Sequence, residues 1–466
     1  MSSPAPPPHV PPPAGDAVGA LCTAVPGPAS QAWLARLKCV ESPDVTFKAA
    51  DFPVVWASAR GSCVRDVDGN TYLDATSAFG VAFVGHAHPR VTEAAARQAQ
   101  QLPHAMGDVH PSAVRIALLE ALAEWTPGDL GHGVLCTGGS EAVEVALKTA
   151  LRATGRPGVI AFHGGYHGLG TGALDTTSRR AFRDPFAALL GRNTSFLPWP
   201  DSAAPPVGVA AAAVGAHALA RVEEALGHPG AGGLAVGAVI VEPVQGRGGC
   251  RIPPDGFLAG LRAACDRHGA LLVLDEIYTG CGRTGTRFAC EADGVVPDVL
   301  LVGKALGGGF PIAACLGRPA VMAAWGESTG EALHTSTFLG HPVACAAALA
   351  TLDVIRSEDL VLRARDNGAR LLHDLQAATS GLRGVHAVRG RGLLLGVELR
   401  DPESGTPARA HAWRTTVEAL RRGLIVLPAG CFGEVIQLAP PAVLTETQRD
   451  WLVATLAAAL HAASDA

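Results

Sequence analysis

Two adjacent acids follow a strongly apolar run in the stretch LLVLDEIYTGCGRTG, Leu271 to Gly285. The run predicts a strand buried on both faces, where desolvating an unpaired carboxylate is costly. Asp275 and Glu276 at its end therefore need partners, and we expect a cation near Asp275. A second run, LLVGKALGGGFP, ends at Lys304 and continues into three glycines and a proline. Burial lowers the pKa of a lysine and frees its amine to attack a carbonyl carbon, and the glycines let a bulky group approach.

A third feature could bind an anion. The segment LCTGGSEAVEVALK places Gly139 and Ser140 at the opening of a predicted helix, where free amides and the positive end of the helix dipole accept phosphate. Each feature has an ordinary alternative, since Lys304 can cap a strand and Gly139 and Ser140 can cap a helix. Together, a phosphate seat, a strand-end aspartate and a strand-end lysine are what pyridoxal phosphate needs. A nucleotide-binding loop does not fit, because the glycines follow Lys304 and no Ser or Thr comes next.

The elements that must position these residues alternate along the chain. From about residue 132 to 304, short apolar runs alternate with helix-length segments, which predicts a parallel sheet wrapped by helices. Ligands of such sheets collect at the carboxyl ends of the strands. The residues that follow the runs are Thr137 to Ser140, His163 to Gly168, Glu242 to Arg247, Asp275 to Tyr278, and Lys304.

We expect an α/β fold with two domains. The large cofactor-binding domain would span residues 81–344, and a smaller α+β domain would combine residues 31–80 with 345–466. In the smaller domain, GSCVRDVDGNTYLD predicts a hairpin and RGRGLLLGVEL predicts a strand. The proline clusters of residues 1–30 predict a disordered, unpacked tail.

Composition excludes several classes of protein. The 466 residues are 17% charged and 48% hydrophobic with a net charge of −5, as in ordinary globular proteins of more than one domain. No run of Lys and Arg predicts binding to nucleic acid, and no apolar stretch is long enough to span a membrane. The start of the chain lacks the features of a signal peptide, so we expect a cytoplasmic protein.

Metal and disulfide chemistry are not indicated. The eleven cysteines are scattered without a CxxC pair. His163 and His167 stand four apart, but the two glycines between them oppose the helix that a metal site would need, so we expect no metal.

The sequence resembles the class III aminotransferases, the pyridoxal-phosphate family that includes the ornithine, acetylornithine and 4-aminobutyrate aminotransferases. The similarity runs from about Phe52 to Leu452 and implies fold type I of the pyridoxal-phosphate enzymes. Eight blocks in the family order carry it: DVDGNTYLDATSAFGVAFVGHAHP, GGSEAVEVALK, FHGGYHG, VEPVQGRGG, DEIYTGCGRTG, GKALGGGFPIAA, STFLGHPVACAAALA and VIQLAPPAVLT.

The resemblance implies roles at the reacting centre and at the phosphate. Lys304 would form the Schiff base with the cofactor and move a proton between Cα and C4′ as general base and acid. Asp275 would hold the protonated ring nitrogen. Gly139 and Ser140 would bind the phosphate through backbone amides, and Thr337 would reach the phosphate of the neighbouring subunit. That last role requires a homodimer.

Further cofactor contacts follow from the same resemblance. Tyr166 would stack on one face of the ring and Ile277 would press on the other. Both are ordinary core residues without the family context. Glu242 would lie near the cofactor in a supporting role, and His167 and Tyr278 complete the expected contacts.

Departures from the family pattern concern the substrate. Gln437 stands where much of the family has an arginine that grips the substrate carboxylate, and Arg247 stands where the ornithine and 4-aminobutyrate enzymes have a glutamate. Our hypothesis is that Arg247 takes over carboxylate recognition, with the keto acid acceptor as the candidate ligand; the alternative is that it pairs with a structural acid. Tyr278 replaces a common glutamine, which puts the usual contact near the ring 3-hydroxyl in doubt. Phe79 would line the pocket entrance or simply pack.

The predicted activity is transfer of an amino group from an amine or amino acid to a keto acid by a ping-pong mechanism. A racemase, epimerase or aminomutase on the same scaffold is the alternative, and a non-catalytic cofactor-binding module is a minor one. The residues leave the donor, the acceptor and the pathway open.

Overall fold

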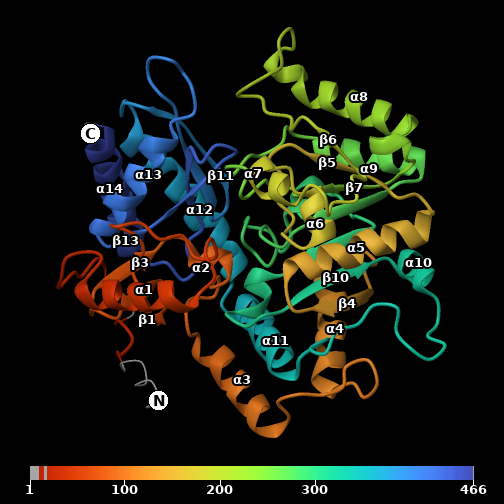
Figure 1. Cartoon of the computed structure of the whole chain (residues 1–466), viewed down its shortest axis with the longest axis horizontal. Coiled ribbons are helices and arrows are strands. Elements are labelled where there is room, and N and C mark those ends of the chain that lie inside the picture. Colours follow the sequence, from red (N-terminus) through yellow and green to blue (C-terminus); the bar gives the residue numbers. More distant parts are fainter. Residues whose placement is uncertain (1–9, 15–17, 465–466) are drawn as a thin grey trace.

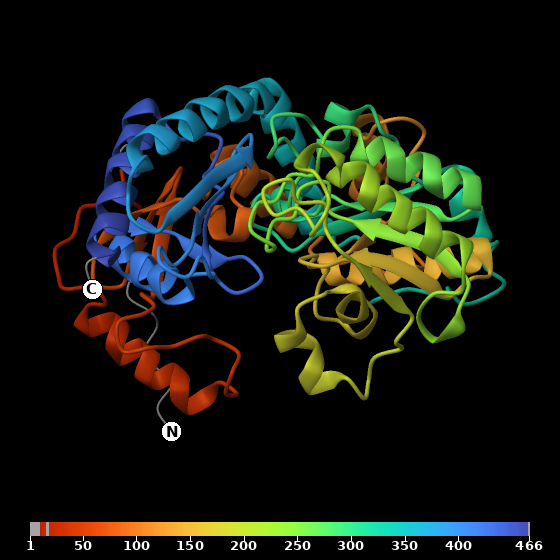
Figure 2. The same ribbon diagram turned by 90° about the horizontal axis from the view of Figure 1, so that it is seen from above.

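A computed structural model of the protein describes residues 10–14 and 18–464. Two lobes lie side by side, and the N-terminal helix α1 and the C-terminal helix α14 belong to the same lobe (Figures 1 and 2). The bounds of these helices are Pro28–Val40 for α1 and Glu446–Ser464 for α14. Segments from the beginning and from the end of the described chain therefore share the smaller lobe.

The larger lobe is built on a mostly parallel sheet. Within the described residues this sheet has seven strands in the order β4-β10-β9-β8-β7-β5-β6, and only β10 runs in the direction opposite to the other six. The predicted runs form β4, β5, β7, β8 and β9, whereas β6 and β10 were not predicted. The bounds are β4 His132–Cys136, β5 Gly158–Phe162, β6 Thr194–Leu197, β7 Val236–Val241, β8 Leu271–Asp275, β9 Val299–Val302 and β10 Ala313–Gly317.

Apolar side chains cover both faces of this sheet. In β8, Val273 packs into one buried cluster while Leu272 and Leu274 pack into another, as the alternation of side chains along a strand requires. Helix α5 (Gly139–Thr154) covers one face, and α9 (Phe257–His268) covers the other together with α8 (Val214–Gly227). Because both faces of the sheet are buried, the polar side chains of these segments lie at the ends of the strands.

The smaller lobe contains two sheets of four strands each among the described residues. One has the order β1-β2-β3-β13 and the other β11-β12-β15-β14. Strand β13 pairs in parallel with β3, so segments from opposite ends of the chain share one sheet. The bounds are β1 Trp56–Arg60, β2 Cys63–Asp66, β3 Thr71–Asp74, β11 Val385–Arg391, β12 Leu394–Leu399, β13 Leu424–Ile425, β14 Leu427–Ala429 and β15 Val435–Leu438.

The remaining helices flank or join the lobes. Helix α11 packs on α3 and α4, and α12 and α13 pack on α14. None of the helices among the described residues is both long and apolar enough to cross a membrane. The bounds are α2 Ser77–Gly80, α3 Pro89–Gln101, α4 Ala113–Trp125, α6 Thr171–Thr176, α7 Arg180–Arg183, α10 Pro319–Met322, α11 Pro342–Ser357, α12 Leu360–Thr379 and α13 Arg409–Arg421, with short 3-10 turns at Asp184–Phe186, Ala211–Ala213, Ala231–Gly233, Ala289–Asp293, Lys304–Gly307 and Ala323–Trp325.

Two segments differ from the sequence predictions. The stretch RGRGLLLGVEL forms parts of two antiparallel strands, because Gly392 turns the chain with φ +55° in close contact with the backbone of Thr284. Part of the predicted tail, residues 1–9 and 15–17, lies outside the described residues. Its described part contacts the folded lobe: Leu21 packs against a buried apolar cluster, and the amide of Cys22 donates to Asn70 Oδ1 at 2.8 Å.

Candidate active site

The carboxyl ends of the parallel strands meet around one cavity of about 590 Å³. Strand β4 ends before the opening of α5, β7 ends before Glu242, β8 ends at Asp275, and β9 ends just before Lys304. The predicted residues that line the cavity are Gly139, Ser140, Tyr166, His167, Glu242, Arg247, Asp275, Ile277, Tyr278 and Lys304.

Asp275 has a buried partner that sequence reasoning did not assign to it. Its Oδ2 lies 2.7 Å from Nδ1 of His167, and its Oδ1 accepts the backbone amide of Ile277 at 3.1 Å. Burial by itself lowers the pKa of His167, but the hydrogen bond to Asp275 and the charge of Glu242 outweigh it, so the pKa is raised above its usual value. The pair fixes the orientation of the Asp275 carboxylate. No local signal predicts it, because the two residues are 108 positions apart.

Glu276 points away from the cavity and has a structural role. It is fully buried, and its carboxylate accepts the amides of Ala289 and Cys290 at 2.8 Å each and the hydroxyl of Thr279 at 2.6 Å. Three donors compensate for its desolvation. The two adjacent acids at the end of β8 therefore serve opposite sides of the strand.

Glu242 joins two segments of the cavity wall. Its carboxylate accepts the backbone amides of Tyr166 and Gly246, each at 3.0 Å. Burial raises the pKa of Glu242 to about 7, and the nearby charge of Asp275 adds to the shift. Glu242 thereby holds the loops after β5 and β7 together.

Lys304 occupies a strained backbone position in the cavity wall. Its φ is +44°, in the left-handed region that side chains rarely adopt. Its Nζ lies 3.8 Å from the ring centroid of Tyr278. Burial lowers the pKa of the amine to about 8; Asp275 and Glu242 oppose this shift, and Arg247 contributes to it. A lysine with such a pKa has a substantial neutral fraction near pH 8.

The opening of α5 could seat a small anion. Gly138 precedes the helix in an extended conformation, and the first amides of a helix have no intrahelical partner. The hydroxyl of Ser140 accepts the amide of Gly170 at 2.8 Å. A β-carbon at Gly139 would lie 2.8 Å from Ile277 Cδ1, and one at Gly168 would lie 2.7 Å from Ser140 Cβ. Only glycine fits this tight backbone.

Arg247 lines the cavity without an acidic partner. Its guanidinium carbon lies 5.8 Å from the centroid of the Tyr166 ring. Within residues 18–464 its guanidinium group makes no ion pair and no hydrogen bond with the protein. The alternative that Arg247 pairs with a structural acid therefore finds no support.

Gln437 does not line the cavity. It is buried, its amide nitrogen donates to the carbonyl of Gly246 at 2.8 Å, and its amide oxygen accepts the Tyr278 hydroxyl at 3.3 Å. The two ends of the side chain therefore hold the loop at Gly246 and the ring of Tyr278. Where relatives have an arginine, this chain has no cation.

Phe79 and Thr337 also lie outside the cavity lining. Phe79 is 56% exposed and follows Ser77 and Ala78 in a left-handed turn, with φ between +48° and +63° for the three residues. Arg283 donates hydrogen bonds to Ser77 Oγ and to the Gly80 carbonyl and so supports this turn. Thr337 is exposed on the surface of the described chain.

Sequence reasoning missed part of the cavity wall. The missed side chains are apolar neighbours of the chemical motifs, and their only signal is that they adjoin the glycine-rich segments. They are Val81, Leu169, Phe310, Pro311 and Ile312.

Comparisons with known proteins agree with this architecture. The family model for class-III aminotransferases matches residues 46–460. The acetylornithine aminotransferase of Mycobacterium tuberculosis is 40% identical over 413 residues, which cover 88% of this chain and 92% of that protein. An (S)-enantioselective omega-transaminase from Thermomicrobium roseum superposes with a TM-score of 0.85 at 30% identity, covering 93% of this chain and 98% of that one. The ornithine aminotransferase of Toxoplasma gondii has a TM-score of 0.80 at 29% identity, covering 93% and 95%.

The fold and the site are those of a pyridoxal-phosphate-dependent transaminase. The chain belongs to the class-III aminotransferases. Its residues fit the cofactor of that family: the cavity offers an anion seat closed by glycines, an amine with a lowered pKa, and a carboxylate held in place by His167.

Proposed function

We propose that the protein moves an amino group from an amine or amino acid to a keto acid in two half-reactions, with Lys304 as the residue bonded to the cofactor aldehyde. The observation that carries this proposal is the meeting of Lys304, Asp275 and the α5 anion seat in one cavity. When bound, pyridoxal phosphate supplies an electron sink for charge that develops at the substrate carbon bearing the amino group. The residues of this chain supply binding, orientation and proton movement.

Lys304 and Asp275 would divide the proton chemistry. Lys304, with a pKa of about 8, would take the proton from the substrate carbon as a neutral amine and return it as an ammonium. Asp275, oriented by His167, would keep a proton on the ring nitrogen. Gly139 and Ser140 would anchor the phosphate through their amides.

The cavity walls would fix the orientation of the ring. Tyr166 and Ile277 both line the cavity, and Glu242 holds the backbone of Tyr166. Clamping a planar ring between two side chains excludes water and aligns the bond to be broken with the π system. His167 and Tyr278 would complete the contacts.

The most informative test uses the small number of lysines. The chain has four, at positions 38, 48, 148 and 304, so borohydride reduction followed by peptide mass spectrometry identifies the attachment site without ambiguity. We expect the reduced adduct on Lys304 and none in Lys304→Ala. An adduct on another lysine, or no adduct, would remove the assignment.

Half-reactions separate amino transfer from racemisation. A transaminase loses its yellow colour with an amine donor alone and regains it only with a keto acid. A racemase or epimerase exchanges the substrate proton in deuterated water and inverts the substrate without any acceptor. Inversion without an acceptor, in the absence of bleaching, would replace the proposed function by the alternative.

We further propose that the protein works as a homodimer in which Thr337 reaches the phosphate of the partner's site. Its support is a surface on which apolar side chains gather: Met106 is 57% exposed, Leu333 69% and Phe338 53%. His104 contacts Phe338, with ring centroids 5.4 Å apart, so the segments that carry Met106 and Phe338 lie side by side. Exposed apolar patches of this kind mark protein interfaces.

Subunit mixing tests this arrangement. Lys304→Ala would be inactive and Thr337→Ala would bind the cofactor weakly. If Thr337 acts across the interface, a mixed dimer of the two variants contains one site with both wild-type residues, and activity returns on mixing. If Thr337 acts within its own subunit, no mixed site is complete and mixing restores nothing.

A further inference from the structure

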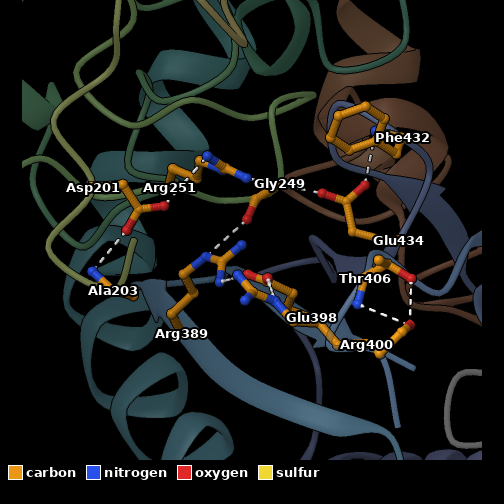
Figure 3. Close-up of polar contacts among 11 residues, drawn as sticks. Asp201, Ala203, Gly249, Arg251, Arg389, Glu398, Arg400, Thr406, Phe432 and Glu434 are labelled. Carbon is orange, nitrogen blue, oxygen red and sulfur yellow. Dashed lines mark hydrogen bonds and ion pairs between the residues drawn. The ribbon is translucent and has the colours of Figure 1, made fainter. Parts of the chain in front are cut away.

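Arg247, in the loop after β7, differs from the neighbouring arginines Arg251 and Arg389, which are paired with acids. Arg251 lies 3.3 Å from Asp201 and 3.9 Å from Glu434 (Figure 3). Arg389 binds Glu398 at 2.5 Å and the carbonyl of Gly249 at 3.0 Å. These cations are neutralised by acids, and they clamp the loop between the two lobes.

Arg247, in the same loop, keeps an unpaired guanidinium at the cavity. Since its backbone carbonyl accepts the amide of Gly430, the loop is also held from the smaller lobe at this residue. Its side chain is half-buried. Desolvating a cation without a counter-ion is unfavourable, so a residue placed in this way is suited to a ligand that brings the negative charge.

A second arginine strengthens the positive potential. Burial lowers the pKa of Arg179, and the charges of Arg247 and Arg409 lower it further. In the part of the chain described here the Arg179 guanidinium makes no ion pair, and its carbon lies 5.5 Å from the Phe182 ring centroid. The acid in this neighbourhood is Glu434, which already accepts the amide of Phe432 at 2.8 Å (Figure 3).

The remaining polar groups do not offer a substitute. The side-chain amide of Gln437 is hydrogen-bonded to the Gly246 carbonyl and to the Tyr278 hydroxyl, so it cannot form a bidentate contact with a carboxylate in the cavity. Arginine matches the two oxygens of a carboxylate with two parallel donors, which neither glutamine nor lysine does.

We propose that Arg247 binds the carboxylate of the keto acid acceptor, and of the amino acid formed from it, with Arg179 adding to the attraction. This inference rests on the proposed amino transfer and names the substrate class of one half-reaction. An amine donor without a carboxylate makes no use of Arg247, so the two half-reactions depend on this residue unequally.

The test compares acceptors that differ in the carboxylate. The holoenzyme is converted to its amine form with a carboxylate-free amine donor and mixed with 2-oxoglutarate, pyruvate or butanal, and the return of the yellow colour is followed. In Arg247→Ala, we expect the half-saturating concentration of both keto acids to rise by about 10-fold or more, as for loss of a charged hydrogen bond, and that of butanal to stay unchanged. Arg247→Lys should lie between, and Arg179→Ala should show a smaller effect.

Two controls make the outcome decisive. Arg180→Ala removes an exposed arginine that is paired with Asp184 and should change nothing. Calorimetric titration of the holoenzyme with glutarate, which cannot react, measures carboxylate binding without catalysis and should weaken about 10-fold in Arg247→Ala.

The contrary results are distinct. Equal losses with keto acids and butanal would show that Arg247 acts on the cofactor or on the fold, and unchanged keto acid and glutarate binding would show that it does not contact the carboxylate. Either result overturns the inference. If no amine donor bleaches the wild-type holoenzyme, the proposed amino transfer is overturned. The glutarate titration would still decide the role of Arg247.

Discussion

The lowered pKa of Lys304 gives the sharpest prediction from this structure. Burial brings the pKa of its amine to about 8, from 10.5 for an ordinary lysine. At pH 8, about one half of such amines are neutral, compared with about 0.3% at the ordinary value. Since only the neutral amine attacks electrophiles, the reactive fraction of Lys304 at pH 8 should be roughly 150-fold larger than its ordinary pKa would allow.

The assay follows acylation of the cofactor-free protein by a small reagent across pH 6 to 10, with each lysine peptide quantified by mass spectrometry. Lys38, Lys48 and Lys148 serve as internal references in the same sample. The midpoint of the Lys304 curve, rather than its absolute rate, is the relevant quantity, because access to the cavity scales the rate but does not move the midpoint. Circular dichroism checks that the cofactor-free protein is folded.

Variants that remove a nearby charge test the direction in which the pKa of Lys304 moves. Asp275 and Glu242 raise the pKa of Lys304, so Asp275→Asn and Glu242→Gln should each move the midpoint below that of the wild type. Arg247 lowers this pKa, so Arg247→Ala should move the midpoint upwards. A midpoint near 10.5, or the same midpoint in all variants, would refute the electrostatic account of the cavity.

Three further predictions concern stability. Gly80→Ala should destabilise the protein by about 2 to 4 kcal/mol in urea denaturation, because φ of Gly80 is +85° and a β-carbon there would lie 2.4 Å from Cε2 of Tyr278. The control is Gly131→Ala, which should have little effect because the space around Gly131 is open. Glu276→Gln should cost about 1 to 3 kcal/mol, because its amide would place a donor against backbone amides; an unchanged denaturation midpoint would contradict the role of that carboxylate. Because burial raises the pKa of Glu242 from 4.5 to about 7, its stabilising contribution is complete below pH 4.5 and is lost as the pH rises through about 7. Cofactor-free Glu242→Gln should therefore gain stability relative to wild type between pH 5 and pH 8, and a constant difference would argue against the raised pKa.

The sequence by itself determined the features that depend on neighbouring residues. Apolar runs predict the strands, and in a parallel sheet their carboxyl ends share one edge, which brings Asp275, Lys304, Glu242 and the opening of α5 to one cavity. The strands β6 and β10 escaped prediction, because Thr194–Leu197 and Ala313–Gly317 are short and lack a distinct pattern.

Only the tertiary structure decided which side chains meet. His167 became the partner of Asp275, Gln437 was committed to Gly246, and Arg247 was left with a free guanidinium group among the described residues. Local sequence fixes a strand and the turn after it, because their hydrogen bonds and apolar spacing lie within a few residues. The partner of a buried polar group depends instead on which distant segments pack against it, and in this protein that choice separates a cation available for substrate from cations neutralised within the fold.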